Sequence, residues 1–471
     1  MSKAWLLLRC SVVVATLVAG AFSVSAQSVD IMSSPNVVGS GARALGMGGA
    51  FIAIADDATA ASWNPGGLTQ LERPEISLVY DFQWNSERFS SSSHPEIAGR
   101  YTANFHDFNY ASAVYPIRRT IAGRNLVLSL NYQRQYDFDR NLDFRYRDVL
   151  GLAGGNIAGI SSNVRYRQRG QLSALSPAIG FELTHRLSVG MVLNIWHESL
   201  LSSNEWEIQM DERRTFHING IMGPWSWTRF SMNEKYKNFR GVNATFGMLY
   251  RATERLQFGL VYHTKFTADV DYERRVHIWG GQGSSIVTDK RSQEIVFPSA
   301  IGLGVAYRFP NDKLTIAMDV TRRAWDQFMI HDPRNRRLDR RRISGVTGLP
   351  PGRHDVDAVY TVRVGAEYVF VNEKKAIQNY LPSVRVGAFY DPEPASNRPD
   401  RFFGLGRGNG KPDDYYGLTL GLGVLIKDRV NLDAAYVYRW GSGVRKDTFG
   451  FTGTDANVRQ HSLYFSTVVY F

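Results

Sequence analysis

Two glycine-rich runs contain the residue types that hold phosphate groups in nucleotide-binding proteins. The first, residues 39–49, follows no predicted strand, whereas a dinucleotide-binding loop joins a strand to a helix. The second, residues 404–411, has Leu405 at the first required glycine position and Pro412 directly after its lysine. Neither run therefore predicts a nucleotide cofactor.

Residue types for catalysis or metal binding are equally sparse. The pair His197-Glu198 lacks the second histidine of a zinc-protease helix, and the ten histidines form no pair with ligand spacing. No Gly-x-Ser-x-Gly nucleophile elbow is present. The single cysteine, Cys10, lies in a segment that we expect to be removed, so the mature chain has no thiol nucleophile. We expect no enzyme activity, no metal and no cofactor.

Arginines crowd one predicted loop near residues 334–342. Arginine forks pair well with phosphate, so the loop could contact the phosphates of lipopolysaccharide. The alternative is a solvated loop without a partner. The candidate lipopolysaccharide contacts are Arg336, Arg337, Arg340 and Arg341.

The N-terminal residues indicate the compartment. Lys3 and Arg9 precede an uncharged stretch and the small residues 24–26, which is the pattern of a secretory signal peptide. We expect residues 1–26 to be the signal peptide and the mature chain to begin at Gln27. Without Lys3 and Arg9 the formal net charge of +11 falls by two to +9, which favours acidic lipid head groups as partners and not nucleic acid.

Most of the chain alternates between large apolar and small polar residues. In 76–84 the even positions are apolar or aromatic, whereas Ser77 and Asp81 fall on the other face. A soluble sandwich would carry lysine and glutamate on its polar face, but here that face carries glycine and other small residues. After the first thirty residues no apolar run approaches the 18 residues of a transmembrane helix. These features predict that residues 74–471 form a transmembrane β-barrel.

The connections between the alternating stretches are short and long in turn, and their number gives the strand count. Six short turns and seven long polar connections make thirteen connections, hence 14 strands. An even number places both ends of the barrel in the periplasm and the long connections outside the cell. The short turns lie near 118–125, 184–186, 251–255, 310–313, 371–381 and 427–429, and the long connections near 87–106, 139–164, 201–239, 271–293, 329–355, 392–414 and 441–459.

Residues 27–73 neither alternate nor resemble a linker. Asp56 or Asp57 is placed to cap a short helix from Ala58 to Trp63, which Asn64 would end. The segment is too hydrophobic for a disordered periplasmic tail, and it has no amphipathic face around which to form a core of its own. We therefore expect it to fill the lumen as a hatch. The residues expected to form the hatch and border the substrate pocket are Phe51, Ile52, Ile54, Asp56, Asp57, Trp63, Asn64, Pro65, Gly66 and Leu68.

Three motifs resemble the N-terminal hatch of the FadL family of outer-membrane transporters for hydrophobic compounds. They are residues 41–51 (GARALGMGGAF), 54–58 (IADDA) and 63–68 (WNPGGL), with Gly66 where the family usually has alanine. The resemblance implies passive uptake of long-chain fatty acids or hydrocarbons through an apolar pocket gated by the hatch. It also implies lateral release into the membrane beside a kinked strand. The long connections match nothing that identifies the substrate.

Arg363 and Arg385 lie on the small-residue faces of their strands and so point into the predicted lumen. Either could contact the head group of a fatty acid, or pair with Glu367 or with the hatch aspartates Asp56 and Asp57. Burying about ten methylenes is worth roughly 8 kcal/mol, whereas an accessible ion pair contributes at most about 1 kcal/mol. We therefore expect affinity to come from apolar contacts, with charge orienting the head group.

The sequence thus predicts an all-β protein, a 14-stranded antiparallel transmembrane β-barrel with an N-terminal hatch in its lumen. We expect a monomer in the bacterial outer membrane whose partners are a hydrophobic small-molecule substrate, outer-membrane lipid and lipopolysaccharide. The alternative is a non-transporting barrel that serves as a docking or secretion platform for other proteins. An outer-membrane hydrolase is a third alternative, which predicts cleavage of lipid or peptide.

Overall fold

The computed structural model describes most of the chain from Val38 to Phe471. The predicted signal peptide and three of the four candidate lipopolysaccharide contacts, Arg336, Arg337 and Arg340, lie outside the described residues. No helix in the described part is long and apolar enough to cross a membrane. The described ranges are 38–117, 123–151, 155–198, 204–219, 221–222, 227–281, 283–310, 312–333, 341–352, 356–372, 378–395, 411–446 and 453–471.

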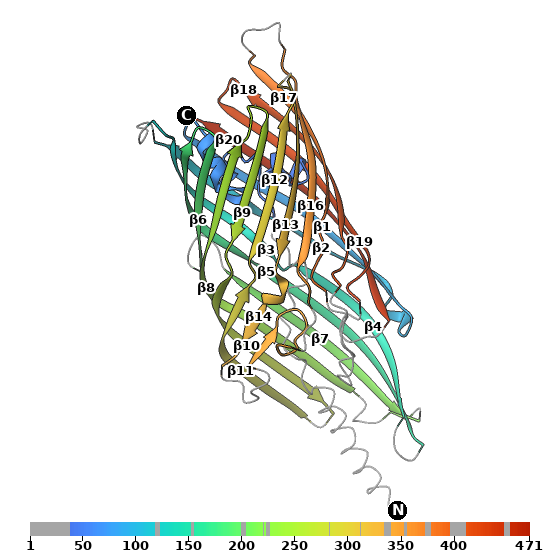
Figure 1. The fold of residues 1–471 in the computed structure, drawn as a ribbon. Helices are drawn as coiled ribbons and strands as arrows, with labels where there is room; N and C mark the ends of the chain where they lie inside the picture. Colours follow the sequence, from blue (N-terminus) through green and yellow to red (C-terminus); the bar gives the residue numbers. More distant parts are fainter. Residues whose placement is uncertain are drawn as a thin grey trace, which may run out of the picture.

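Fourteen strands pair with two neighbours each and close into an antiparallel barrel (Figure 1). The ring closes where the first strand pairs with the last along its whole length, from Glu75–Tyr470 to Ser91–Thr454. The predicted 14-stranded barrel is therefore confirmed. In ring order the strands are β1 (Glu75–Ser91), β2 (Gly99–Pro116), β3 (Leu126–Asp137), β5 (Ile157–Thr184), β6 (Leu187–His197), β8 (Trp227–Arg251), β9 (Leu256–His263), β12 (Ala300–Arg308), β13 (Leu314–Arg323), β16 (Val359–Val369), β17 (Tyr380–Tyr390), β18 (Tyr416–Ile426), β19 (Val430–Val444) and β20 (Thr454–Tyr470).

The period-two alternation of the sequence becomes the two faces of the wall. On β18, Leu418, Leu420 and Leu422 are exposed, whereas Thr419 on the other face is buried. Exposed leucines in an unbroken row are unfavourable in water and favourable against lipid chains. The apolar face is thus the lipid-facing band, and the small polar face lines the lumen.

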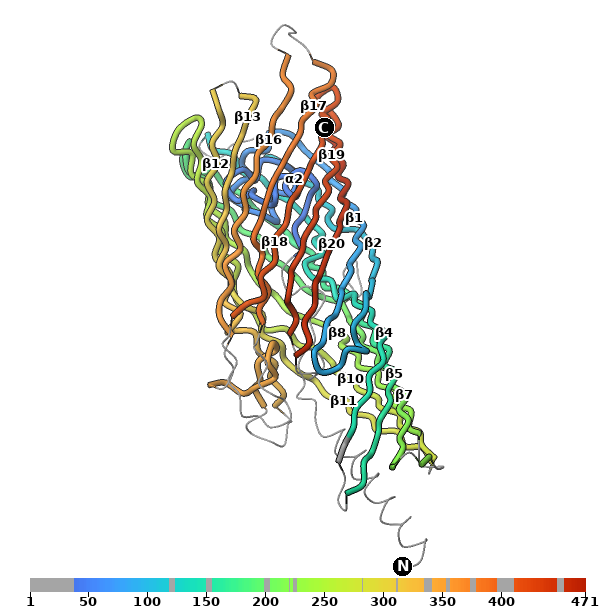
Figure 2. The backbone as a smooth tube through the Cα atoms, turned by 90° about the vertical axis from the view of Figure 1, so that its right-hand side faces the viewer, coloured from blue at the N-terminus to red at the C-terminus, as the bar shows by residue number. Residues whose placement is uncertain are grey.

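At the end of the barrel away from the C-terminus, several strands continue the wall well past the others (Figure 2). This extension runs β4–β5–β7–β8–β10–β11–β14–β15 across neighbouring strands. Its additional elements are β4 (Arg140–Gly151), β7 (Glu205–Ile218), β10 (Phe266–Gly280), β11 (Gly283–Phe297), β14 (Met329–His331), β15 (Arg342–Ser344) and the 3-10 turns η2 (Pro95–Ile97) and η3 (Trp325–Gln327).

The extension corrects the predicted long loops. The described residues of 87–106, 139–164, 201–239, 271–293 and 441–459 are mostly strand. The physical reason is that the outer face of these segments contacts water and carries charge, so the apolar stripe that marks a lipid-facing strand is missing. Their inner face is apolar and buried.

Aromatic side chains fill the lumen at the level where the extension begins. Trp206 stacks on Tyr236 with ring centroids 4.3 Å apart, and Phe266 stacks on Phe297 at 4.9 Å. Such contacts hold the inner faces of strands that are distant in sequence against one another. We call the buried rings Tyr136, Phe138, Trp196, Trp206, Tyr236, Phe239, Phe266, Tyr272, Phe297, Trp325 and Phe328 the aromatic cluster.

The N-terminal segment, residues 38–73, lies inside the ring near the end that carries the C-terminus (Figure 1). It contains α2 (Ala42–Gly46), α3 (Ala60–Trp63) and the 3-10 turn η1 (Pro65–Gln70). The predicted cap is wrong, since α3 begins after Thr59 without a side-chain cap. Asp57 instead accepts hydrogen bonds from the N–H and hydroxyl of Thr59 at 2.8 and 2.6 Å. Asn64 ends α3 as predicted, and its side chain accepts from the N–H of Gly66.

Candidate functional site

Glycines on the inner faces of the strands let the N-terminal segment approach the wall closely. A Cβ on Gly365 would overlap the carbonyl of Met47, and a Cβ on Gly387 would overlap the N–H of Gly48. Gly48 itself has φ +68°, a conformation that suits glycine. The small-residue face seen in the sequence is therefore the surface against which this segment packs.

Polar side chains anchor the backbone of the segment at two places. Asp319 of β13 accepts hydrogen bonds from the N–H groups of Phe51 and Ile52 at 2.6 and 2.8 Å. The Asn64 amide donates to the carbonyls of Ile52 and Met248 at 2.8 and 2.9 Å. Because buried backbone groups need partners, these bonds fix where the segment lies on the wall.

An ion-pair network joins the segment to β16, and Arg43 is its centre. The guanidinium binds both oxygens of Glu367, at 2.9 and 2.8 Å, and Asp56 at 2.6 Å. Asp57 lies 3.7 Å from the same group. Burial raises the pKa of Asp57 above its usual range, and the charge of Arg43 opposes that shift. Arg43 is thus the cation that compensates both hatch aspartates.

Arg385 belongs to the same network of ion pairs. It is buried and donates to Glu367 at 2.7 Å and to Asp433 at 2.6 Å. Of the two alternatives for this residue, the structure places it in the ion pair with Glu367. The hatch aspartates pair with Arg43 and not with Arg385 or Arg363.

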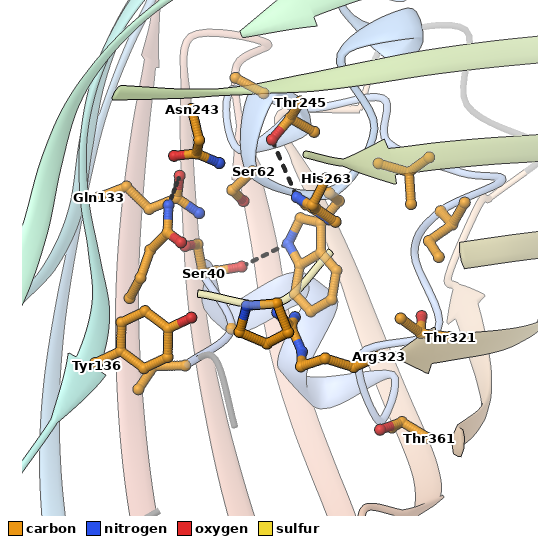
Figure 3. A pocket seen from close by; sticks show the side chains of 18 of the residues that line it. Ser40, Ser62, Gln133, Tyr136, Asn243, Thr245, His263, Thr321, Arg323 and Thr361 are labelled. Carbon is orange, nitrogen blue, oxygen red and sulfur yellow. Dashed lines mark hydrogen bonds between the residues drawn. The ribbon is translucent and has the colours of Figure 1, made fainter. Parts of the chain in front are cut away.

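A cavity of about 100 Å³ lies between the N-terminal segment and the wall. Figure 3 shows Tyr136, His263 and Arg323 around it, with the Trp63 indole donating to the carbonyl of Ser40 at 2.8 Å. The lining residues are Val38, Gly39, Ser40, Ile52, Ala61, Ser62, Trp63, Gln133, Gln135, Tyr136, Asn243, Thr245, Val261, His263, Thr264, Phe266, Pro298, Thr321, Arg323, Thr361, Arg363 and Asp391.

The lining is more polar than predicted. The expected pocket against the hatch was apolar, but this cavity is bordered by amides, hydroxyls, His263 and charged groups. Its charged residues are Arg323, Arg363 and Asp391, so positive charge exceeds negative by one. Asp391 lies 3.8 Å from Arg363 and 3.2 Å from Arg439, so it is shared between two cations. The cavity therefore favours an anionic or hydrogen-bonding group.

Next to the cavity the barrel wall is split. β2 and β3 pair only from Tyr110–Gln133 to Pro116–Val127, whereas β2 continues beside β1 as far as Gly99. β3 has a register shift between Arg134 and Tyr136 in its pairing with β5. Beyond this kink, toward the extension, the facing edges of β2 and β3 are not paired with each other. β5 and β8 also leave their ring neighbours β6 and β9, but there β7 and β10 take over the pairing. Among the described strands, none takes over from β3 the pairing with β2 beyond Tyr110.

The N-terminal segment bridges the split from the inside. The N–H of Val38 donates to the carbonyl of Gln135 on β3 at 2.9 Å. The Asn109 amide on β2 donates to the carbonyl of Gly39 at 3.0 Å. The segment therefore bonds to the backbone of β3 and to a side chain of β2.

Arg134 occupies the split itself. It is fully buried, its guanidinium lies 2.7 Å from Asp81 of β1 and 3.0 Å from Asp137, and the ring of Phe105 on β2 lies 4.5 Å away. These contacts reach across the split to both strands beyond it, so the side chain closes the wall at this level.

The sequence matches a family model over most of its length. The model, described as outer membrane protein transport protein (OMPP1/FadL/TodX), covers residues 11–467. The chain belongs to this family. The resemblance drawn from the hatch motifs and the predicted outer-membrane location are thereby confirmed.

Solved structures of OMPP1/FadL/TodX proteins share the fold. A Pseudomonas aeruginosa FadL homologue is 14% identical with a TM-score of 0.58, covering 93% of this chain and 99% of that one. The Ralstonia pickettii toluene transporter TbuX is 14% identical with a TM-score of 0.52, covering 92% and 98%. The Pseudomonas putida toluene transporter TodX is 12% identical with a TM-score of 0.53, covering 93% and 99%. No curated protein sequence matches the chain.

The structure brings only part of the predicted site together. Of the predicted hatch residues, Ile52 and Trp63 line the cavity, whereas Phe51 and Leu68 pack into the apolar contact with the wall. Arg363 lines the cavity, as its predicted luminal position requires. Arg341 lies in the described part of the chain, and its contact with lipopolysaccharide stays a prediction. Among the described residues no three His, Cys, Asp or Glu side chains group as metal ligands.

The sequence reasoning missed Arg43 and the lining residues Gln133, His263 and Arg323. The only signal of the three lining residues was a polar residue within or at the end of a strand, and many strands carry one. Arg43 lies inside a recognised hatch motif, but its partner Glu367 is 324 positions away.

Proposed function

We propose that the protein is a passive channel that takes up hydrophobic small molecules bearing a polar or anionic head group. The observation that carries the proposal is the cavity between the N-terminal segment and the wall, next to the split between β2 and β3. In this proposal residues 27–73 form the hatch of a barrel made by residues 74–471. We infer that transport runs down a gradient, since the sequence carries no motif for a nucleotide.

The apolar part of the route is the aromatic cluster. Tyr136 and Phe266 belong both to this cluster and to the lining of the cavity, so apolar surface leads directly to the polar end. Because an apolar cavity of about 150 Å³ accommodates benzene, a cavity of about 100 Å³ holds a head group and not a whole long-chain ligand. The chain of the ligand would lie among the rings, which must rearrange as it passes.

The charge of the lining supports an amphipathic substrate. Arg323 and Arg363 outnumber Asp391, and His263 and Asn243 add hydrogen-bonding groups. A carboxylate would gain charge-assisted hydrogen bonds there, which are the stronger kind. A long-chain fatty acid or an aromatic acid combines such a head group with the apolar chain or ring that the aromatic cluster suits.

Release would occur sideways through the split into the membrane. A lipid-like solute gains nothing by entering water. Displacement of Arg134 from the unpaired edges of β2 and β3 would give it a path into the bilayer. Val38 and Gly39 bridge these edges and also line the cavity. Movement of the hatch would therefore open the exit and, in the same step, remove the part of the cavity lining that the hatch supplies.

Uptake by proteoliposomes tests the proposal and its substrate class together. We would compare a fluorescent long-chain fatty acid with the corresponding neutral alcohol in the wild type, Arg323→Met and the matched control Arg322→Met, whose side chain is exposed on the next position of the same strand. We expect Arg323→Met to slow fatty-acid uptake about tenfold, in line with one charge-assisted hydrogen bond, and to leave alcohol uptake and the control unchanged.

The outcomes separate the parts of the proposal. No uptake of either compound by the wild type would contradict the channel. Equal uptake of both compounds by the wild type and by Arg323→Met would contradict the head-group site and leave an apolar channel.

A further inference from the structure

The far ends of three neighbouring hairpins in the extension carry exposed apolar side chains. The hairpins are β4–β5, β7–β8 and β10–β11, and they are adjacent because β5 pairs with β7 and β8 pairs with β10. These ends are separated from the lipid-facing band by several polar residues along every strand. We call the residues Val149, Ile157, Ile221, Met222, Trp227 and Ile286, all exposed, the apolar tips.

The apolar tips are exposed large apolar residues and belong to none of the buried clusters of the described structure. Ile221 and Met222 are 68% and 63% exposed, and the Trp227 ring is 44% exposed. The side chains that do form the core of the extension, such as Phe144 and Tyr166, lie on the opposite face and are buried. Large apolar side chains gathered at one exposed end mark a surface that contacts something apolar.

Arginines line the outer face directly behind the apolar tips. Arg145, Arg165, Arg213 and Arg229 surround a shallow hollow, and we call these four the arginine hollow. The acids in its lining are Asp143, Asp211 and Glu212, of which Glu212 is buried and paired with Arg214. All four arginines are exposed. With four arginines and three acids, the hollow thus has an excess of one positive charge.

Within the hollow, Arg213 of β7 stands directly opposite Arg229 of β8. Like charges directly opposite on one face of a sheet are destabilising. Asp211, 3.8 Å from Arg229, offsets the repulsion only in part. Such an arrangement is favourable when anionic groups from outside occupy it.

The row of charges closer to the lipid-facing band is built differently. There Glu207 pairs with Lys235 at 3.4 Å and Glu273 with Lys290 at 3.0 Å across neighbouring strands. Across the paired strands, positive and negative side chains alternate in this row. The successive residues are Arg169, Glu207, Lys235, Glu273 and Lys290. The extension therefore neutralises its charge near its own membrane and keeps an excess of positive charge beside the apolar tips.

We propose that this end of the extension docks onto an apposed anionic lipid surface, separate from the membrane that holds the barrel. The apolar tips would enter the interface, Trp227 would lie at its polar boundary, and the arginine hollow would contact phosphate or carboxylate head groups. Apolar residues at the front with cations behind them match the layers of such a surface. The alternative occupant is a protein with an acidic, apolar patch. The lipid surface is favoured because the tips are separate hairpin ends that form no groove among the described residues.

Such docking would deliver poorly soluble molecules to the mouth of the lumen, although it does not depend on the proposed transport. The inner face of the same strands carries the aromatic cluster, so a lipid surface held at the tips lies at one end of an apolar lining.

Vesicle flotation tests the proposal with the full-length protein in phosphatidylcholine nanodiscs. The probe is vesicles of phosphatidylglycerol and phosphatidylcholine in equal parts, compared with vesicles of phosphatidylcholine alone. The variants are Arg213→Gln with Arg229→Gln, and Trp227→Ser with Ile286→Ser. The matched control is Lys235→Gln with Lys290→Gln, which removes two positive charges from the balanced row.

We expect binding to the anionic vesicles alone, weakened at high salt because exposed charges are screened. The arginine pair should lose more than about tenfold in affinity, since each cation near an anionic surface is worth about fivefold. The tip variant should lose about fivefold or more, whereas the lysine control should lose less than about threefold.

Three results would overturn the proposal: equal binding of neutral vesicles, equal losses in the arginine and lysine variants, or no vesicle binding at all while an acidic protein is bound. The heat-dependent migration of the folded barrel in detergent gels shows that every variant is folded. The same variants are also assayed for uptake of a soluble substrate supplied without micelles. If only docking is impaired, this uptake stays unchanged, whereas a defect of the channel would lower it.

Discussion

Replacing Arg43 with methionine should weaken the attachment of the proposed hatch to the barrel wall. Methionine keeps the length of the apolar stem but removes the cation. The change leaves Asp56 and Asp57 without their partner, and it removes both hydrogen bonds to Glu367. Glu367 keeps its bond to Arg385, so the uncompensated charge falls on the two hatch aspartates.

The magnitude follows from the burial of the network. Removing one partner of a buried ion pair costs about 3–5 kcal/mol. The Arg43 and Asp56 side chains are 18% and 21% exposed, so water compensates part of the loss and the lower end applies. A cost of about 3 kcal/mol raises the population of the displaced hatch roughly a hundredfold, since each 1.4 kcal/mol is a factor of ten.

The labelling rate of a single cysteine measures that population. Residues 27–471 contain no cysteine, so Ala61→Cys introduces a unique thiol in a residue that is 4% exposed in the structure. A maleimide too large for the cavity reacts only when the hatch moves. We expect Arg43→Met to speed labelling about a hundredfold. Arg73→Met is the control, because Arg73 is exposed and binds the Asp428 carbonyl at the barrel rim.

Less than a threefold change in a folded barrel would refute the reasoning that this ion pair holds the hatch. A similar acceleration in the Arg73 control would refute it equally, because the effect would then not be specific to the luminal network.

Three further substitutions probe the seat of the hatch, the split and the buried aspartate. Gly365→Ala places a methyl group against the Met47 carbonyl and should lower the free energy of unfolding by about 1–3 kcal/mol, seen as a lower melting midpoint in detergent; Gly280→Ala, which meets nothing closer than 3.5 Å, should leave it unchanged. Arg134→Met leaves Asp81 and Asp137 uncompensated in the wall and should raise the ion conductance of the channel in planar bilayers, whereas the exposed Arg88→Met should not; equal conductance in both would contradict the closing role of Arg134. Because burial raises the pKa of Asp57, the docked hatch binds a proton more tightly than the displaced one, so cysteine labelling should speed up as pH rises from the ordinary aspartate pKa to the raised one, and Asp57→Asn should flatten this slope.

The faces of the barrel strands could be predicted from the sequence because alternation is a local property. Ser77 and Leu78 reveal their sides of the wall by their type and position alone. The count of 14 strands followed from the connections, since hairpin turns are also local. The extension could not be recognised in the same way, because Arg165 and Arg213 on a water-facing strand look like residues of a polar loop.

The cavity could not be predicted because its residues come together only through the stagger of the barrel. Gln133, Asn243, His263 and Arg323 lie on different strands, and their common level depends on the register of every pair between them. A single sequence contains no measure of that stagger. The network of Arg43 could not be predicted for the same reason, because its partner Glu367 is 324 positions away in the sequence.

The central claim is that substrate passes from the cavity to the membrane through the split that the hatch bridges, and a reversible cross-link tests it most directly. Val38 and Gln135 are joined by a backbone hydrogen bond of 2.9 Å, so Val38→Cys with Gln135→Cys can form a disulfide that fixes the hatch at the split. The control pair Ala113→Cys with Leu130→Cys joins β2 and β3 where they are already paired. We predict that oxidation stops fatty-acid uptake in the first variant only and that a reductant restores it; undiminished uptake with the disulfide fully formed would contradict the account.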